Sequence, residues 1–539
     1  MEFHFSPRPN RAAEIEWRPW SEEAFREAQQ ADKPVLLSIS AVWCHWCHVM
    51  DETSYSDDRV IGLINREYVP IRVDNDVRPD VNQRYNMGGW PTTAFLTPEG
   101  DILTGATYLP PEQMTAALSK LSGYYRDNRT EIAAQVTRGR EKAQQAAAIS
   151  AGKLQPGLVD RILGNVEQAY DAEYGGFGDA PKFPQTDALA LLAEQSLLRG
   201  EPGLLEMARH TLAQMAGGGT YDHVEGGFFR YSTTRDWSVP HFEKMLEDHA
   251  GLLSALALTG QAEILDDAVR YLETVLRDEQ TGLYAGSQDA DEDYYARDEA
   301  GRQELRPPYV DRRVYVAWNC ALAVAYLDAD ARLDRPRLRE RALQVLDAVF
   351  QRFSDPAGGL LHTDEVGGQL GDQVWGLLAC VRAGQRERAS QLLGVLRDRY
   401  ADAELGGYFD HAAVDSTARL AQRQKPLGEN ATAALALAEM GESDLARQAL
   451  ESVGALFRQY GLMSAVFARA FDRLGREPVK LSTSSPDLAR AALNAYPYAM
   501  VEPGEAEGAV ICVGTRCLRP ASTVAELKER LAQIGSPVG

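Results

Sequence analysis

Residues 39–50 read ISAVWCHWCHVM, with Cys44 and Cys47 two residues apart and His48 directly after them. Three chemistries use a stretch of this kind: thiol–disulfide exchange by a CxxC pair, attachment of c-type haem, and metal binding by cysteine and histidine. Each chemistry needs a different protein around the motif. The segments on either side of it therefore decide which chemistry applies.

The flanking segments alternate between strand and helix patterns. A short apolar run of strand length comes directly before the motif, and a PEG turn joins the last two predicted strands. Ser21 is a candidate N-cap, and paired prolines open the closing helix. The predicted strands are 34–40, 69–75, 92–97 and 101–107, and the predicted helices include 21–33, 57–67 and 110–125.

This order resembles the thioredoxin-like plan, in which the CxxC pair stands at the start of a helix. Helix N-termini favour a thiolate, so Cys44 is the predicted nucleophile and Cys47 the resolving cysteine. Protonated His45 would stabilise the Cys44 thiolate further. Trp43 before the motif and Pro91 in GGWP extend the resemblance, which implies a cis peptide bond at Pro91.

The other two chemistries fit this surrounding less well. Haem attachment needs a haem-binding helical domain, usually outside the cytosol. A structural zinc usually takes four ligands, and no second cysteine pair lies near Cys44 in the sequence. We expect neither a metal nor a cofactor. A thioredoxin fold kept as an inactive docking module remains an alternative.

Bulk composition limits the partners. The 539 residues carry a net charge of 56 − 78 = −22, which disfavours binding to nucleic acid or to an anionic membrane surface. The N-terminal segment has no apolar core of export-signal length, and no apolar stretch approaches a membrane span, so we expect a cytoplasmic protein. Six cysteines are too few for a disulfide scaffold, so a disulfide here is expected to be transient and catalytic.

Beyond residue 150 the chain is rich in alanine and leucine and predicts repeated helical hairpins. Short links alternate with long ones that share an acidic residue, glycines and an apolar or aromatic residue, as in DAEYGGF and DAELGGYF. Six hairpins closing on themselves give an (α/α)6 toroid, and a solenoid is the alternative. The predicted helices are 153–170, 185–199, 202–216, 243–258, 260–277, 314–328, 335–353, 373–384, 386–400, 428–440, 442–457 and 460–473.

Polar and aromatic residues gather in the second and third long links. If a helix begins near Phe242, then Glu243 and Glu247 share one face of it. Such a cluster could perform catalysis on a sugar, bind a ligand without chemistry, or serve the fold alone. The candidate site residues are His223, Arg230, His241, Glu243, Glu247, His249, Asp289, Asp291, Asp311, Trp318 and Asn319.

These motifs together resemble the thioredoxin-domain family that includes spermatogenesis-associated protein 20 and its bacterial relatives. The resemblance rests on WCHWCHVM, GGWPTTAFLTPEG, GGFGDAPKFP and the long stretch from His223 to Ala250. It implies a thioredoxin-like domain fused to a six-hairpin, glycosidase-like toroid, and it implies no established reaction. Some family motifs are altered, because Asp-Asp-Lys-Val is replaced by residues 311–314 and Leu-Glu-Asp-Tyr-Ala by residues 370–374.

The expected fold is therefore multidomain, α/β followed by all-α. Its parts are a thioredoxin-like domain (1–130), a linker helix (131–152), the toroid (153–480) and a C-terminal α/β segment (481–539). Cys512 and Cys517 are either a second redox pair or two small residues in a terminal strand, whereas Cys320 and Cys380 fall in apolar helices.

Three functions remain open from the sequence. The first is a thiol–disulfide oxidoreductase acting on a disulfide-bearing protein or a small thiol, with the toroid binding substrate or partner. The second is a carbohydrate-active enzyme, epimerase- or glycosidase-like, that works in the toroid. The third is a scaffold with neither activity.

Overall fold

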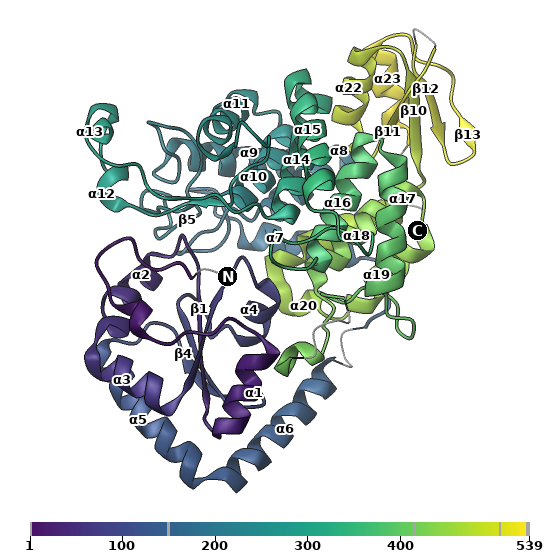
Figure 1. The fold of residues 1–539 in the computed structure, drawn as a ribbon. Coiled ribbons are helices and arrows are strands. Elements are labelled where there is room, and N and C mark those ends of the chain that lie inside the picture. The colour runs from purple at the N-terminus through teal and green to yellow at the C-terminus, as the bar shows by residue number, and fades with distance from the viewer. Residues whose placement is uncertain (1–2, 148–150, 413–416, 506–507, 535–539) are drawn as a thin grey trace. The chain divides into compact units, whose positions relative to one another are not determined.

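The computed structural model describes residues 3–147, 151–412, 417–505 and 508–534. The chain divides into two compact units (Figure 1). Unit 1 comprises Met1–Ile149, His362–Gln369 and Asp410–Gln424, and unit 2 comprises Ser150–Leu361, Leu370–Phe409 and Lys425–Gly539. Each unit has its own sheet or helical core, so they are described one at a time.

Unit 1 is built around a four-stranded sheet of order β2-β1-β3-β4. The first two strands are parallel, and the third runs antiparallel to the first. The thioredoxin-like order predicted from the sequence is thus confirmed. The strands are β1 (Val35–Ser40), β2 (Val69–Asp74), β3 (Thr92–Leu96) and β4 (Ile102–Ala106); the helices are α1 (Glu22–Ala31), α2 (His45–Glu52), α3 (Asp58–Glu67), α4 (Pro79–Tyr85), α5 (Pro111–Asp127) and α6 (Arg129–Ala147).

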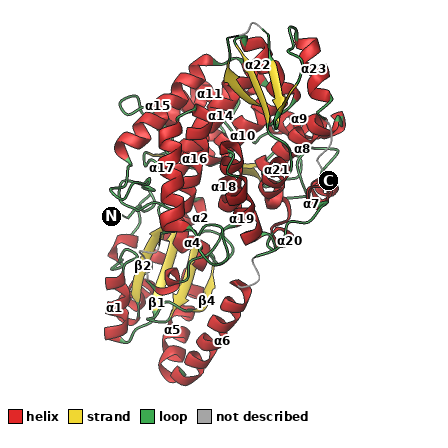
Figure 2. Ribbon diagram, turned by 90° about the vertical axis from the view of Figure 1, so that its right-hand side faces the viewer, coloured by secondary structure: helices red, strands yellow, loops and turns green. Residues whose placement is uncertain are grey.

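Both faces of this sheet are buried under helices (Figure 2). Side chains of α1 and α4 cover one face, where Phe25 and Tyr85 pack on strand residues such as Leu37. Helices α3 and α5 cover the other face, with Ile64 and Met114 in its core. Because strands covered on both faces must be apolar throughout, the continuous run Val35–Ser40 forms the central strand.

Unit 1 also contains two segments from much later in the chain. Leu420 is fully buried in the core of the face that α1 and α4 cover. Arg84 forms an ion pair with Asp410 at 2.7 Å and donates to the backbone oxygens of Arg419 and Gln422. The core on one face of this sheet is therefore completed by a later segment, in which Arg419 N–H donates to the hydroxyl of Tyr85, 334 positions earlier in the chain.

The toroid of unit 2 is formed, within the described residues, by twelve helices in six hairpins. Six inner helices each contact the next, and the last contacts the first, which closes the ring and confirms the predicted (α/α)6 toroid. The inner helices are α8 (Thr186–Arg199), α10 (Leu246–Thr259), α14 (Val316–Leu333), α16 (Leu370–Ala383), α18 (Leu427–Met440) and α21 (Ala465–Leu474); the outer helices are α7 (Leu158–Ala169), α9 (Pro202–Gly217), α11 (Ala262–Tyr271), α15 (Pro336–Arg352), α17 (Arg386–Val395) and α19 (Ser443–Val453).

The long links share one turn, which an aspartate closes. In the second link, Asp222 N–H donates to Gly227 O at 3.0 Å, and Asp222 Oδ1 accepts the N–H of Val224. Gly227 has φ +82°, and a Cβ there would meet the Tyr271 ring at 2.6 Å. The predicted repeat is confirmed, with Asp222 rather than Glu225 as its acidic residue. The equivalent aspartates are Asp171, Asp278, Asp355 and Asp402.

The C-terminal part of unit 2 is a small α/β layer with its own apolar core. Its sheet has the order β11-β10-β12-β13. The elements are β10 (Val479–Thr483), α22 (Pro486–Ala495), β11 (Met500–Pro503), β12 (Val510–Val513), β13 (Arg516–Cys517) and α23 (Val524–Ala532). Among the residues that the structure describes, no helix has the length and apolar composition that crossing a membrane requires.

Candidate functional site

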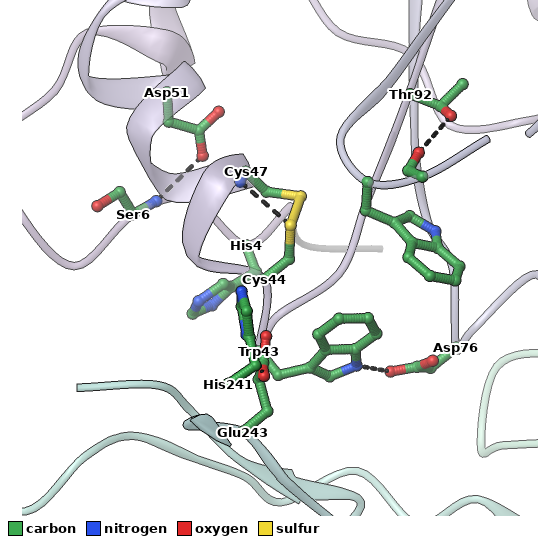
Figure 3. Close-up of a disulfide and its surroundings, with 12 residues drawn as sticks. His4, Ser6, Trp43, Cys44, Cys47, Asp51, Asp76, Thr92, His241 and Glu243 are labelled. Carbon is green, nitrogen blue, oxygen red and sulfur yellow. Dashed lines mark hydrogen bonds and ion pairs between the residues drawn. A yellow bond between two sulfur atoms is a disulfide. The ribbon is translucent and has the colours of Figure 1, made fainter. Parts of the chain in front are cut away.

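The CxxC pair lies where β1 ends and α2 begins (Figure 3). Cys44 and Cys47 are joined by a disulfide, and their Cα atoms are 5.2 Å apart. Cys44 is the N-cap of α2, and its Sγ accepts the backbone N–H of Cys47 at 3.1 Å. N–H groups at a helix start favour a negative charge, so the Cys44 sulfur stands where a thiolate is stabilised.

The two aromatic side chains next to the pair are fixed by polar contacts. Trp43 donates its indole N–H to Asp76 Oδ2 at 2.6 Å, and its ring meets that of Trp90 edge-on at 5.5 Å (Figure 3). The peptide bond between Trp90 and Pro91 is cis, as the sequence predicts. Thr92 Oγ1 donates to Gly89 O and holds the turn that leads into β3.

His48 and Asp51 anchor the inner side of α2. Burial, together with the nearby His4 imidazole, lowers the pKa of His48 to about 3, so this ring is neutral at ordinary pH. Asp51 is buried and receives two hydrogen bonds from Arg72 at 2.8 and 2.9 Å. It also accepts the N–H of Ser6, which fastens the N-terminal segment to the helix.

In unit 2 the structure brings three of the predicted site residues close together. His241 lies in β6 (Pro240–His241), and its Nδ1 is 2.5 Å from Glu243 Oε2. Glu243 is buried, and its backbone oxygen accepts the N–H of Arg230. The His241 ring stacks on Tyr231 at 4.9 Å, and Tyr231 in turn stacks on the half-exposed ring of Phe183 at 4.6 Å.

The helix expected to begin near Phe242 instead begins at Leu246. Lys244 and Met245 form β7, which pairs with β8 (Ser287–Gln288), and β8 also pairs with β9 (Val310–Asp311). Glu243 therefore does not share a helix face with Glu247, and that prediction is wrong. Residues Lys244 and Met245, which the sequence pattern predicted to be helical, are instead in a short strand.

Two carboxylates stand in the first turn of α10. Glu247 is solvent-exposed, although protein groups surround its carboxylate closely enough to raise its pKa. Burial raises the pKa of Asp248 to about 7, and the charge of Arg230 opposes that shift. Asp248 Oδ2 is buried and has no hydrogen-bond partner among the described residues. Carboxyl groups with such pKa values are common at functional sites.

Several other predicted site residues support the fold. His249 is fully buried, receives the N–H of Phe228 at Nε2 and contacts Met245 O through Nδ1. The Asn319 side chain accepts the N–H of Tyr284 and donates to its backbone oxygen. Asp291 caps the short helix α12 (Glu292–Tyr295). These side chains use their polar groups within the protein.

The other candidate residues make contacts of their own, and none of these contacts involves His241. His223 is exposed, with its ring nitrogen Nε2 3.1 Å from Gly218 O. Asp311 is buried and accepts the Tyr315 hydroxyl at 2.9 Å, and the ring of Trp318 lies 4.4 Å from that of Tyr315. Asp289 is buried beside β9, where its N–H donates to Tyr309 O.

The sequence reasoning missed a set of buried lysines. Lys244 is fully buried, and its Nζ donates to Asp222 at 2.7 Å and to Gly226 O at 2.9 Å. Burial lowers the pKa of Lys244 to about 8. Lys182 and Lys425 make the same two contacts in the first and last long links. No fixed spacing in the sequence pointed to them, because Lys182 lies 11 residues after its aspartate whereas Lys244 lies 22 residues after its own.

The buried ring of His249 makes the stability of unit 2 depend on pH. Its pKa is lowered to about 4 by burial, against about 6.5 in an unfolded chain. Between these values the unfolded chain binds a proton that the folded chain does not. The free energy of unfolding is therefore expected to fall by about 3 kcal/mol as the pH drops through this window.

Urea unfolding at a series of pH values measures this dependence. His249→Gln keeps a donor and an acceptor but does not titrate, so its unfolding free energy should vary less between pH 6.5 and 4. His223→Gln changes an exposed ring in the same link and should leave the slope as it is. Equal slopes for wild type and His249→Gln would contradict the assignment.

In the described parts of the chain, no group of three or more histidine, cysteine, aspartate and glutamate side chains is placed to hold a metal ion. The two candidate positions present a CxxC pair in unit 1 and an imidazole–carboxylate pair in unit 2.

Comparison with known proteins supports the resemblance seen in the sequence. Residues 8–144 match the family model Thioredox_DsbH, described as a protein of unknown function, DUF255. Spermatogenesis-associated protein 20 from Homo sapiens is 35% identical over 306 residues, which cover 51% of this chain and 39% of that protein. The alignment thus spans well under half of the relative's length. The predicted similarity to this family is confirmed.

Two further similarities concern the separate units. A thiol:disulfide interchange protein DsbD from Campylobacter jejuni is 32% identical over 79 residues, or 14% of each chain. The crystal structure of a D-mannose isomerase covers 59% of this chain and 97% of its own, with 12% identity and a TM-score of 0.47. Unit 1 is thus a thioredoxin-like module that carries a CxxC pair and is similar to DsbD over these 79 residues.

Proposed function

We propose that this chain, whose first unit is a DsbH-type thioredoxin-like module, is a thiol–disulfide oxidoreductase that reacts through Cys44 and Cys47. The observation that carries the proposal is the position of the Cys44 sulfur. It caps α2 and accepts the Cys47 N–H at 3.1 Å, which favours the thiolate form of Cys44 over its thiol.

The exchange proceeds in two steps. In the reduced protein the Cys44 thiolate attacks one sulfur of a substrate disulfide, forming a mixed disulfide and releasing the other substrate sulfur as a thiolate, which takes up a proton. Cys47 then loses its proton and attacks Cys44 Sγ, which breaks the mixed disulfide and releases the second substrate thiol. Two electrons pass to the substrate, and the Cys44–Cys47 disulfide forms.

The surroundings fit an apolar substrate segment. Both cysteine side chains are largely covered, whereas Trp46 between them in sequence is 48% exposed and lies against Tyr108 at 5.2 Å. His48 is neutral, so it adds no positive charge near the sulfur. A disulfide-bearing peptide that packs on Trp46 would bring its sulfur to the start of α2. We therefore propose a protein disulfide as the substrate class.

Trapping the mixed disulfide tests the proposal. In a Cys512→Ser/Cys517→Ser background, Cys47→Ser should accumulate a covalent complex with a disulfide-bearing peptide, because no resolving thiol remains. Intact mass measurement should show one peptide per chain, released by dithiothreitol. Adding Cys44→Ser should remove the complex. A Cys47→Ser variant that forms no adduct would overturn the proposal.

A second function is favoured by the pair of His241 and Glu243. A carboxylate that accepts from Nδ1 makes Nε2 the basic nitrogen, which is the arrangement of a general base. Phe183 ends the ring stack that begins at His241 and is 40% exposed, and an exposed aromatic face suits the apolar C–H surface of a sugar. We propose proton abstraction next to a sugar carbonyl as the reaction of unit 2.

Deuterium exchange tests this second function. A panel of aldoses and ketoses incubated with the protein in heavy water should lose the proton next to the carbonyl, as followed by nuclear magnetic resonance. His241→Gln should abolish the exchange, whereas His223→Gln, an exposed histidine of the same link, should retain it. Absence of exchange across the whole panel would rule this function out.

A further inference from the structure

The two cysteines near the C-terminus face each other across a hairpin. Cys512 in β12 pairs directly with Cys517 in β13, and a disulfide joins them with their Cα atoms 3.9 Å apart. The turn between them contains Gly514 with φ +55°, as two-residue hairpin turns require. β13 is the outermost strand in the sheet order, so the pair stands at a sheet edge (Figure 1).

The pair is accessible from solvent. Cys517 is exposed and Cys512 is partly buried, and exposed Arg516 precedes Cys517. The strand that carries Cys517 has only two residues, and Leu518 N–H donates to Ile511 O at 2.7 Å just beyond it. Because Cys517 is exposed, an external thiolate can reach its sulfur.

The other two cysteines of unit 2 provide a contrast. Cys320 in α14 and Cys380 in α16 are fully buried, and burial raises the pKa of both thiols, that of Cys380 to about 12. Such thiols react slowly with external disulfides. Accessibility therefore separates Cys512 and Cys517 from the remaining cysteines of the same unit.

A purely structural role explains the pair poorly. The disulfide closes a very short loop, and the stabilisation from restricting an unfolded chain grows with loop length. The sheet already has its own core, in which Leu481, Ile511 and Val513 are buried against α22 and α23. The position of β12 therefore does not depend on the disulfide, whereas the short edge strand β13 has few other contacts along the sheet.

We propose that Cys512 and Cys517 form a reversible redox site that exchanges with a dithiol and whose reduction releases the edge strand β13. A thiolate of the dithiol attacks Cys517 Sγ, breaking its bond to Cys512, which leaves as a thiolate and takes up a proton. The second thiol of the reductant then loses its proton and attacks the reductant sulfur that is bonded to Cys517. This breaks the mixed disulfide and releases Cys517 as a thiolate, which takes up a proton. The pair gains two electrons and two protons, and the dithiol becomes a disulfide.

Thiol trapping on the full-length protein tests the proposal. A Cys44→Ser/Cys47→Ser variant is equilibrated in mixtures of reduced and oxidised dithiothreitol, quenched with acid, and labelled under native conditions with a maleimide. Intact mass should show two labels appearing together as the mixture becomes more reducing, and disappearing when it is made oxidising again. Cys320→Ser/Cys380→Ser in this background should give the same curve.

Amide hydrogen exchange gives a second readout. Reduction should speed exchange at Leu518, whose N–H donates to Ile511 O, while amides of β10 keep their rates. A pair that dithiothreitol reduces only after the protein is unfolded would be a structural staple, and the proposal would fail. A pair that never forms a disulfide in oxidised protein would also overturn it. Because the variant lacks Cys44 and Cys47, neither outcome depends on the function proposed for unit 1.

Discussion

Replacing Cys44 with serine is expected to abolish disulfide exchange by the full-length protein, leaving only the rate seen without protein. A serine hydroxyl at the start of α2 stays protonated near neutral pH and cannot form a disulfide. Cys47 does not compensate, because it lacks the N-cap position that favours the thiolate of Cys44. Initial rates with a fluorescent disulfide peptide, dithiothreitol as terminal reductant and the Cys512→Ser/Cys517→Ser background measure the effect.

Cys320→Ser is the matched control for this prediction. It removes a buried thiol from α14 and should leave the exchange rate unchanged. The unfolding free energy of reduced Cys44→Ser should stay close to that of reduced wild type, because the hydroxyl can still accept the Cys47 N–H. Substantial exchange by Cys44→Ser would place the reaction elsewhere in the chain.

Replacing Asp222 with asparagine is expected to lower the free energy of unfolding by about 3–5 kcal/mol. Asp222 is buried and pairs with two buried cations, Lys244 at 2.7 Å and Arg302 at 2.7 and 2.9 Å. Burial alone would raise its pKa, but these partners lower the pKa of Asp222 to about 2. The variant removes the direct anionic partner of Lys244 and leaves Arg302 with Glu225 at 3.2 Å, and removing one member of a buried charge cluster is costly.

Urea unfolding followed by far-ultraviolet circular dichroism measures this loss. Asp278→Asn is the matched control, since Asp278 closes the same turn in the next long link and accepts the N–H groups of Gln280 and Thr281. Among the described residues no lysine pairs with Asp278, and the asparagine side-chain oxygen can still accept both N–H groups, so the expected loss is about 1 kcal/mol or less. Equal losses for the two variants would mean that the turn, and not the charge, matters.

Local patterns were sufficient to predict much of the fold. The apolar run of β1 and the capping position of Cys44 follow from neighbouring residues, whereas the cis bond at Pro91 was implied by the resemblance to thioredoxin folds. The toroid followed from the glycine turns of the long links, because a turn that only glycine can make recurs wherever the hairpin recurs. Helix boundaries agreed to within several residues because caps and periodicity are short-range signals.

Contacts between distant segments could not be predicted. β7 replaced the expected helical turn at Lys244 because β8 supplies its pairing partner, some forty residues later in the printed sequence. The sequence alone does not show that Lys244 and Lys182 are buried, because the aspartates that pair with them are distant in the chain. His249 and Asn319 read as site residues, since sequence cannot show that backbone groups already occupy their ring and amide atoms.

The late return of the chain to unit 1 has a consequence for synthesis. Strands β1 to β4 leave the ribosome first, but Arg419, which binds Tyr85, follows 334 residues later. At about 5–20 residues per second this is a delay of roughly 15–70 s. During that time the place of Leu420 in the core stays open and Arg84 lacks Asp410. One face of the nascent sheet therefore lacks part of its core until residues 410–424 have been translated.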